Sequence, residues 1–402
     1  MNESVLQLKC GIKNDDWGKK GKESKAARLW SRTPGNGPID DSKMYSEMWM
    51  GTYPKNPSYV ISSGLPLADH LKQNPQVIGK VGVARWGAEI PFLSKILSFS
   101  KALPLQIHQD KALAKTLHQE DPEKFADSNH KPEIAIALSQ FELFVGWKPL
   151  DDIQVLLKLK PLERYAPQHG HLTDEVLKEV CKALLTASPE MVKDTIKELQ
   201  TIPESQFGVS YYIPQMLIRL SSQYSEGDNG HLVATLLMNY MTLKPGDAVC
   251  VPPDSIHAYL HGDIIECMAS SDNVLNTGFC PIAERDSVEL FSRALTFKPH
   301  SVREAKLPKK RSEKGMLDKT DEYAPPISEF NVLATCLDAE EREKHKAIFG
   351  PSLVVVTEGT GHMGVSGLSL NLEEGYVFFV GQGVPLEFST AEGMNVYRAY
   401  AE

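Results

Sequence analysis

Short apolar runs dominate the first 150 residues of the chain, and turn-forming residues such as Gly, Pro and Asn separate them. The segments SVLQLKCGI, YVISSG and ELFVGW are examples. Runs of this kind predict β-strands, because strands usually extend over only about four to eight residues between turns. We therefore expect a mainly β structure with some helix in this part of the chain.

The periodicity changes between residues 151 and about 230. The segments DEVLKEVCKALL and PEMVKDTIKELQ repeat apolar residues at helical intervals, which predicts amphipathic helices. Ser188 and Pro189 form a typical helix start, with the serine as N-cap and the proline at the first helical position. The sequence thus predicts a helical insertion within the β structure.

Strand-like segments return near residue 232 and continue to ECMASSDNVL, so the first β unit is expected to be interrupted and then completed. A charged, turn-rich stretch at about 306–326 is expected to connect two domains. After it, LVVVTEG, GLSLNLEEGYVFFVG and NVYRAYAE predict a second, smaller β sandwich. The predicted division is 1–150 and 232–310 for the first β domain, 151–231 for the helical insertion and 311–402 for the C-terminal β domain.

Composition limits the classes of protein that fit this pattern. The chain has 402 residues, of which 42% are hydrophobic and 24% charged, as expected for a globular protein. Its formal net charge is −9. An acidic chain disfavours general binding to nucleic acid or to anionic membranes, so we expect neither as a partner.

The cysteines are scattered without a CxxC pair, which favours free thiols in a reducing compartment. They are Cys10, Cys181, Cys250, Cys267, Cys280 and Cys336. The chain opens without a cleavable signal, and no apolar run approaches the roughly 18 to 20 residues that span a bilayer. We therefore expect a cytoplasmic protein.

Four side chains on three strand-like segments form a candidate metal site. Gln106 and His108 stand two residues apart in LPLQIHQDK, and in a β-strand such residues project from the same face. In KPEIAIAL, Glu133 shares its face with two alanines that leave room beside the carboxylate. His257 begins the segment after a Pro-Pro break. Two imidazoles, a carboxylate and an amide oxygen suit Zn²⁺.

The spacing around His257 supports this interpretation. Gly246, Pro252 and His257 follow the second half of the cupin signature, with Asp254 where glycine is usual. A Gln-x-His sequence stands where the first half usually has His-x-His. A lone histidine in a strand is more often a hydrogen-bonded core or surface residue than a ligand, so the pattern alone leaves both interpretations open.

Six stretches carry a more specific signal: LQLKCGIKNDDWGKKG, YSEMWMGTYP, LSKILSFSKALPLQIHQDK, FADSNHKPEIAIALSQFELFVGWKPL, GDAVCVPPDSIHAYLHGDIIECMASSDNV and PPISEFNVL. Together they resemble the type I mannose-6-phosphate isomerases, and the resemblance covers nearly the whole chain. It implies a mainly β fold of tandem cupin (jelly-roll) domains, with a helical domain inserted in the first. It also implies one Zn²⁺ per chain, held by Gln106, His108, Glu133 and His257.

The resemblance implies interconversion of mannose 6-phosphate and fructose 6-phosphate through an enediol, which supplies mannose for glycan precursors such as GDP-mannose. A small-molecule sugar phosphate is then the expected partner. The retained candidate positions are Lys95, Tyr259, Glu266 and Asp272 for catalysis and Lys131 for substrate binding. Three have structural alternatives: a surface lysine at 131, a salt-bridged core glutamate at 266 and a turn-capping aspartate at 272.

Three positions depart from the family pattern. Asn276 and Ile282 stand where the family usually has arginine and lysine, and Pro104 stands where eukaryotic members usually have serine. Arg285 is the obvious cation to replace the lost charge, with an ordinary surface position as the alternative. A second hypothesis therefore stays open: a divergent metal-holding cupin that binds a sugar phosphate with weak or no isomerase activity. The sequence determines neither the general base nor the oligomeric state, for which a monomer is one option.

Overall fold

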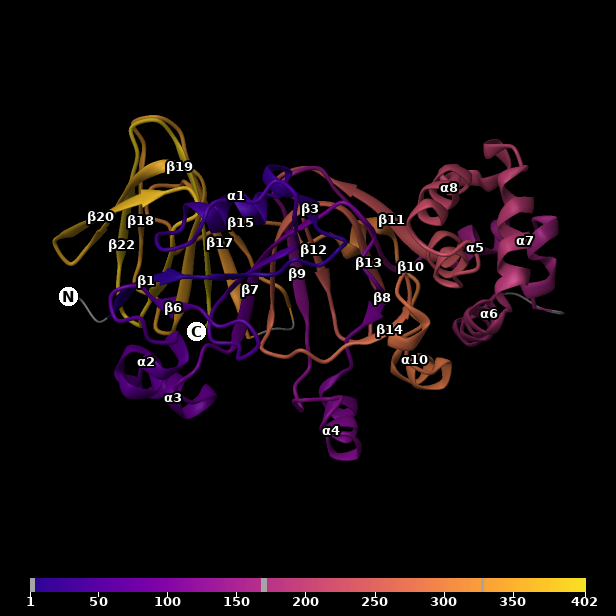
Figure 1. Cartoon of the computed structure of the whole chain (residues 1–402), viewed down its shortest axis with the longest axis horizontal. Coiled ribbons are helices and arrows are strands. Elements are labelled where there is room, and N and C mark those ends of the chain that lie inside the picture. Colours follow the sequence, from indigo (N-terminus) through magenta and orange to yellow (C-terminus); the bar gives the residue numbers. More distant parts are fainter. Residues whose placement is uncertain (1–3, 168–171, 327–328) are drawn as a thin grey trace.

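The computed structural model describes residues 4–167, 172–326 and 329–402. These residues form two large antiparallel sheets side by side along the long axis of the molecule, with a group of helices at one end (Figure 1). The chain is therefore mainly β with helices, as the apolar pattern predicts.

The first sheet has ten strands and is organised around β13 (His257–Ala269), which is 13 residues long. The other strands are β2 (Gly11–Ile12), β5 (Glu47–Met50), β7 (Phe92–Phe99), β8 (Leu105–Ile107), β9 (Glu133–Ala137), β10 (Phe141–Trp147), β11 (Met238–Leu243), β12 (Ala248–Val251) and β14 (Leu275–Gly278). β13 pairs with β7, β8, β9 and β10 at different points along its length. It therefore connects the strands that carry the candidate functional residues.

The second sheet has eleven strands, and two of them come from the N-terminal part of the chain. They are β1 (Val5–Lys9), β6 (Tyr59–Val60), β15 (Lys310–Arg311), β16 (Thr320–Tyr323), β17 (Asn331–Leu337), β18 (Arg342–His345), β19 (Ser352–Val365), β20 (Leu368–Glu373), β21 (Val377–Val380), β22 (Leu386–Ser389) and β23 (Met394–Tyr400). A separate two-stranded sheet pairs β3 (Lys19–Lys20) with β4 (Met44–Tyr45).

The position of β1 and β6 corrects one expectation. The apolar pattern predicts residues 1–150 as part of the first β domain, but β1 pairs with β21 and with β6 in the second sheet. The physical reason is that periodicity reveals a strand without revealing its partner, which is chosen by packing across hundreds of residues of sequence.

Helices flank both sheets. They are α1 (Lys25–Arg32), α2 (Leu67–Gln73), α3 (Lys80–Trp86), α4 (Lys111–Glu120), α5 (Leu150–Leu157), α6 (Asp174–Thr186), α7 (Pro189–Gln200), α8 (Ile213–Gln223), α9 (Gly230–Leu232), α10 (Val288–Ala294) and α11 (Val302–Ala305). The group α5 to α8 lies between β10 and β11 in sequence and at the right end of Figure 1. Ser188 caps α7 by accepting from the Met191 N–H, which confirms the predicted helix start. Within the described ranges, every helix is too short or too polar to span a bilayer.

Shared apolar cores fix these parts against one another. One buried cluster contains Ile96 and Ile265 of the first sheet together with Leu8, Val355 and Phe379 of the second. Another joins the helices α5 to α8 to the first sheet. Close-packed interiors resist deformation, so the strands around β13 form a rigid frame for the functional side chains.

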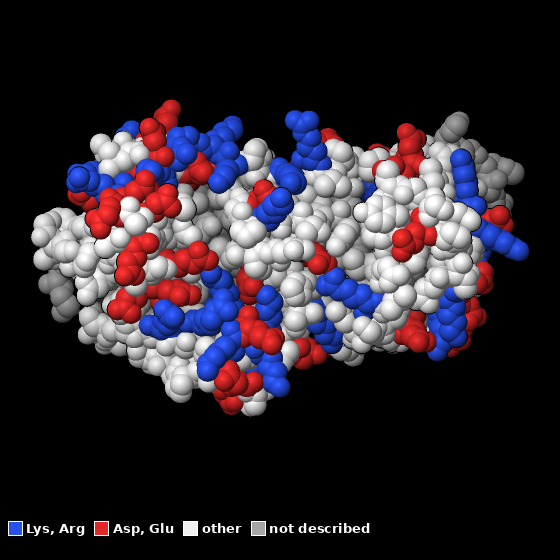
Figure 2. All heavy atoms as spheres, turned by 90° about the horizontal axis from the view of Figure 1, so that it is seen from above, with Lys and Arg blue, Asp and Glu red and all other residues white. Residues whose placement is uncertain are grey.

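Charged side chains of both signs mix on the face seen in Figure 2. Lysine and arginine lie next to aspartate and glutamate over much of this view. Exposed ion pairs of the chain include Lys344 with Glu387 at 3.3 Å. A mixed surface of this kind does not favour a polyanionic partner.

Candidate active site

The ligand-bearing segments meet inside the first sheet because β13 bends. His257 begins β13 and pairs in register with Gln106 of β8. Glu133 begins β9, which pairs with the opposite end of β13, at Met268. Between these points Gly262 adopts a φ of 145°, a conformation that suits glycine and allows the strand to turn. Both ends of β13 therefore contribute to one interior site.

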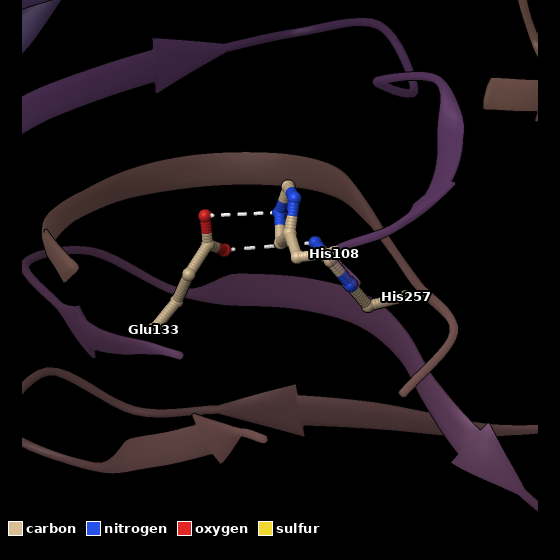
Figure 3. Close-up of side chains that lie close together, drawn as sticks. All are labelled: His108, Glu133 and His257. Atoms are coloured by element: carbon tan, nitrogen blue, oxygen red, sulfur yellow. Dashed lines mark ion pairs between the residues drawn. The ribbon is translucent and has the colours of Figure 1, made fainter. Parts of the chain in front are cut away.

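His108, Glu133 and His257 point toward one another in this interior (Figure 3). Nε2 of His108 lies 3.1 Å from Oε1 of Glu133, and Nε2 of His257 lies 3.6 Å from Oε2 of the same carboxylate. One ligand atom from each of the three lies within 4.8 Å of the others, and no more than 1% of any of these side chains is exposed. The structure thus gathers three of the four predicted ligands around one carboxylate.

Hydrogen bonds orient both imidazoles. Nδ1 of His108 lies 2.8 Å from the Asn273 carbonyl oxygen, and Nδ1 of His257 lies 3.2 Å from the Ser255 carbonyl oxygen. A carbonyl only accepts, so each Nδ1 carries the proton and each Nε2 directs a lone pair toward Glu133. Nε2 of His108 has no hydrogen-bond partner within the described part of the chain. A lone pair that faces a carboxylate is repelled by it, so this arrangement favours a cation that both groups share.

The pKa shifts favour the protonation states that bind a metal. Burial lowers the pKa of His257 to about 4, and burial together with the Lys131 charge lowers the pKa of His108. Burial opposes ionisation of Glu133, but His108 and Lys131 outweigh it and hold the pKa of Glu133 well below its usual range. At neutral pH the site presents two neutral imidazoles and one carboxylate.

The separations fit Zn²⁺. Zinc binds imidazole nitrogen and carboxylate oxygen at about 2.0–2.2 Å, so ligand atoms at tetrahedral angles lie about 3.3–3.6 Å apart. The separations of 3.1 and 3.6 Å around Glu133 are close to this range. Nε2 of Gln106 lies 3.3 Å from Nε2 of His257, and exchange of the amide oxygen and nitrogen, which have the same shape, presents an oxygen there. Gln106 therefore lies beside the three clustered side chains.

Lys131 and Tyr259 contact the same carboxylate. Nζ of Lys131 lies 3.2 Å from Oε1 of Glu133, and the Tyr259 hydroxyl donates to Oε2 at 3.4 Å. Both side chains are buried, so Lys131 is not the surface lysine that was the alternative interpretation. Burial and the Glu133 charge raise the pKa of Tyr259 well above its usual value. The tyrosine therefore stays protonated and able to donate a hydrogen bond beside the candidate metal site.

Glu266 and Lys95 form a buried pair next to the cluster. They face each other in register on β13 and β7, with Nζ 3.4 Å from Oε2 of Glu266. Glu266 also lies opposite Ala135 of β9, two residues beyond Glu133, where the small side chain leaves space between the carboxylates. Burial and the Glu133 charge raise the pKa of Glu266 to about 7. A carboxyl group that titrates near neutral pH can both take and return a proton.

Two residues of β5, to which the sequence assigned no role, also contact Lys95. Glu47 of β5 lies 3.3 Å from Nζ of Lys95, and that Nζ stands 4.5 Å from the centroid of the Trp49 ring. Burial opposes the charge on Lys95, but Glu47 and Glu266 raise its pKa overall. The spacing of Glu47 and Trp49, which share a strand face in EMWM, was the available signal.

Asp272 lies at the partly exposed edge of the candidate active site. Its carboxylate pairs with Lys55, 30% of its side chain is exposed, and its backbone N–H donates to Asp127 at 3.1 Å. Burial opposes ionisation, but the bond from Lys55 and the Lys131 charge keep the pKa of Asp272 below its usual value. None of its hydrogen bonds or ion pairs involves the three clustered side chains.

A cavity of about 700 Å³ lies beside Pro104, directly before β8, and none of the three clustered side chains is among its lining residues. Two of the departures from the family pattern, Pro104 and Ile282, line it, and so does Arg285. Nη2 of Arg285 lies 2.7 Å from Asp228 and 3.0 Å from the Cys280 carbonyl oxygen. Arg285 is therefore a fixed, largely buried cation and not the ordinary surface residue of the alternative interpretation.

Asn276 is the third position that departs from the family pattern. Asn276 of β14 pairs with Gln106, and its buried side-chain oxygen has no partner among the described residues. The other cation that lines the cavity, Lys101, lies 3.2 Å from Asp16. Both cavity cations, Lys101 and Arg285, are thus paired with carboxylates.

Most of the residues that the sequence did not predict orient a candidate functional side chain. Asn273 fixes the His108 ring and Asp228 fixes Arg285, through contacts that span 165 and 57 positions of sequence. Such partners carry no spacing signal, because the contact exists only after the strands have been brought together.

A buried cluster of two histidines and a carboxylate with an adjoining acid–base pair, set among curved antiparallel strands, defines a β-rich metal-dependent enzyme. A family model for the catalytic domain of type I phosphomannose isomerase matches residues 5–150. Mannose-6-phosphate isomerases of Saccharomyces cerevisiae and Schizosaccharomyces pombe are each 35% identical, over 100% and 99% of this chain and 100% of each relative. The chain belongs to the type I mannose-6-phosphate isomerase family.

Solved structures show the same fold. A mannose 6-phosphate isomerase from Salmonella typhimurium bound to substrate and zinc matches with a TM-score of 0.83 and 24% identity, over 99% of this chain and 100% of that one. A mannose 6-phosphate isomerase bound with zinc and yttrium matches with the same TM-score, identity and coverage.

Proposed function

We propose that this chain is a zinc-dependent aldose–ketose isomerase that interconverts mannose 6-phosphate and fructose 6-phosphate through an enediol. Membership of the family supports this reaction, since the yeast relatives are mannose-6-phosphate isomerases. The observation that carries the proposal is the buried His108, Glu133 and His257 cluster beside a carboxyl group whose pKa is about 7. The reaction supplies mannose for glycan precursors such as GDP-mannose.

One Zn²⁺ per chain is held by Gln106, His108, Glu133 and His257 in this proposal. When bound, the ion supplies a Lewis acid that stabilises negative charge developing on the sugar oxygens by several kcal/mol. The carbonyl oxygens that fix both imidazoles pre-orient the ligands, which is the usual role of such outer contacts. The zinc and the substrate in the Salmonella structure support the assignment.

Glu266 is the proposed acid–base group. As a carboxylate it takes the proton from C2 of the aldose, and the electron pair forms the C1–C2 double bond while O1 gains a proton. The proton that O1 gains comes from the Lys131 ammonium group. Glu266 then returns its proton to C1 as O2 gives its proton back to the neutral Lys131, which leaves the ketose and restores both side chains. Lys95 positions the carboxyl from 3.4 Å and keeps it ionisable at neutral pH.

The remaining candidates bind or steady the substrate. Lys131 and Tyr259 donate toward O1 and O2, since both are buried donors that already point at the Glu133 carboxylate. Arg285 binds the phosphate, because its Asp228 contact fixes the guanidinium at the cavity. Asp272 acts from the partly exposed edge of the site, in its pair with Lys55.

A coupled assay tests the proposal. Metal-loaded protein receives mannose 6-phosphate, and formation of fructose 6-phosphate is followed beside Glu133→Ala and His257→Ala variants. Turnover that either substitution abolishes supports the isomerase. Bound metal without turnover would instead establish a divergent sugar-phosphate-binding protein. Two observations make this outcome worth testing: the cavity cations are paired with carboxylates, and the family pattern is lost at Pro104, Asn276 and Ile282.

The finer architecture is part of the proposal. We assign both β units to the cupin (jelly-roll) class, with residues 151–231 as a helical insertion, since antiparallel pairing and the Gly246, Pro252 and His257 spacing favour it. All six cysteines are free, which supports a cytoplasmic location. Limited proteolysis within 151–231 that leaves the two pieces associated in one folded β body would support the division, since β10 pairs with β11 and β13 across the cut.

A further inference from the structure

An arginine lies inside the C-terminal β unit, by which we mean the second sheet and its core, and it is far in sequence from the candidate active site. Arg398 of β23 is completely buried, with 0% of the residue exposed. Its register partners on β17 and β19 are Leu333 and Val354, both buried apolar residues. Val396, on the same face of β23, belongs to the apolar core of this unit. The guanidinium therefore lies in the buried interior of this unit, beside apolar side chains.

The hydrogen bonds of Arg398 are incomplete. Its Nε donates to Ser352 Oγ at 3.0 Å, whereas Nη1 and Nη2 have no partner in the part of the chain that the structure describes. A buried charge without a partner is strongly unfavourable, and arginine rarely escapes by losing its proton. Burial does lower the pKa of Arg398, to about 9, which still leaves the side chain charged at neutral pH.

The neighbouring carboxylates are engaged elsewhere. Glu343 accepts the backbone N–H groups of Met316, Leu317 and Lys319 at 2.8 to 3.0 Å. Glu402 pairs with Lys314 at 2.5 Å, and it accepts the Phe349 N–H at 3.1 Å. Neither carboxylate contacts the free guanidinium nitrogens, so within the described residues the charge has no ion-pair contact, and the Glu402 charge acts on it only without contact. The unit needs a contacting negative charge that these residues do not provide.

A second unsatisfied group lies in the same interior. His345 is 1% exposed, its Nδ1 has no partner among the described residues, and burial together with the Arg398 charge holds its pKa well below the usual value. Its Nε2 lies 2.9 and 3.1 Å from the hydroxyls of Thr335 and Thr320. The imidazole is thus neutral and leaves Arg398 as the uncompensated charge.

We propose that the C-terminal β unit binds one small monovalent anion, of the size of chloride, against Nη1 and Nη2 of Arg398. An anion satisfies both N–H directions and neutralises the charge, whereas a water molecule satisfies only the hydrogen bonds. Complete burial of the guanidinium selects a small ion over a sugar phosphate. The site is independent of the proposed isomerase reaction, and it stabilises the fold of this unit.

Bromide is the probe for the site in crystals of the full chain. An anomalous difference peak within about 3.5 Å of both Nη atoms, at bromide concentrations that label few surface positions, is the expected result. A peak of water height without anomalous signal at this position would overturn the proposal. This measurement uses the wild-type protein, so it stays decisive if an Arg398 variant fails to fold.

Chloride dependence of stability gives the second test. At equal ionic strength, chloride should raise the unfolding temperature of the metal-loaded protein by about 3 °C over gluconate, in a saturable manner. Arg398→Met should lose this chloride-specific rise, whereas Arg303→Met, at an exposed arginine, should keep it. Equal behaviour of wild type and Arg398→Met in the two salts would refute an anion at this site.

Discussion

Glu133→Gln separates metal binding from folding more sharply than any other change at the site. The substitution keeps the shape of the side chain and removes its charge. The new amide N–H can donate to Nε2 of His108, which lies 3.1 Å from Oε1 of Glu133 and has no partner among the described residues. The metal-free protein therefore gains a hydrogen bond at the position where the zinc site loses an anionic ligand.

The magnitudes follow from these contacts. Groups that only orient a metal ligand change metal affinity about 10- to 100-fold, so loss of the ligand charge should weaken zinc binding at least about 100-fold. That factor corresponds to about 2.7 kcal/mol of binding free energy. The metal-free variant should lose about 2–4 kcal/mol of its free energy of unfolding. Its amide gains a bond to His108, but the same atom no longer accepts from the buried Lys131 ammonium.

The assay measures zinc content after dialysis, zinc affinity by competition with a chromophoric chelator, and unfolding of chelator-treated protein. Glu343→Gln is the matched control, since it also neutralises a fully buried carboxylate, one that accepts backbone N–H groups in the C-terminal β unit. We expect the control to lose stability and keep zinc. A Glu133→Gln protein that binds one zinc with wild-type affinity would refute the assignment of this carboxylate as a ligand.

The acid–base carboxyl, the cavity arginine and the helical core each give a further measurable outcome. Glu266 accepts a proton only when it is ionised, so kcat/KM should fall about tenfold per pH unit below the pKa of this carboxyl group. That pKa is about 7 and moves lower when zinc is bound. A flat profile of kcat/KM between about pH 5 and 8 contradicts this role. Arg285→Ala should raise the KM for mannose 6-phosphate about 10- to 100-fold with little change in kcat, and an unchanged KM in steady-state kinetics tells against phosphate binding there. Leu184 is fully buried in α6, so Leu184→Ala should lower the free energy of unfolding by about 3 kcal/mol in a denaturant titration. The substitution should leave kcat/KM unchanged. A loss below about 1 kcal/mol would contradict the place of Leu184 in the core.

Local sequence predicted the features that depend on neighbours along the chain. The alternation in EIAIA places Ala135 and Ala137 in one core cluster and Ile134 and Ile136 in another, as the strand period requires. Ser188 caps its helix because the cap bond spans only three residues. Gln106 lies in β8, whereas His108 lies one residue beyond the end of that strand, so the strand period applies to the first of these two residues only.

Family resemblance located the candidate ligands, but the arrangement around them is a tertiary property. The pairing of Glu266 with Lys95 depends on the register of β13 against β7, and sequence spacing carries no signal for a contact that distant. The same holds for the Asn273 contact to His108 and for the Asp228 contact to Arg285.

By itself the sequence determined strand and helix periodicity and the helix start at Ser188, because these properties depend on residues a few positions apart. The candidate metal ligands, which lie up to 151 positions apart, came from the family resemblance. Only the tertiary structure decided that β1 joins the C-terminal sheet, that β13 bends at Gly262 and that Arg398 is buried without an ion-pair contact among the described residues. Partner choice, register and desolvation are set by packing between distant segments, and the free energies that select them arise only when the whole core closes.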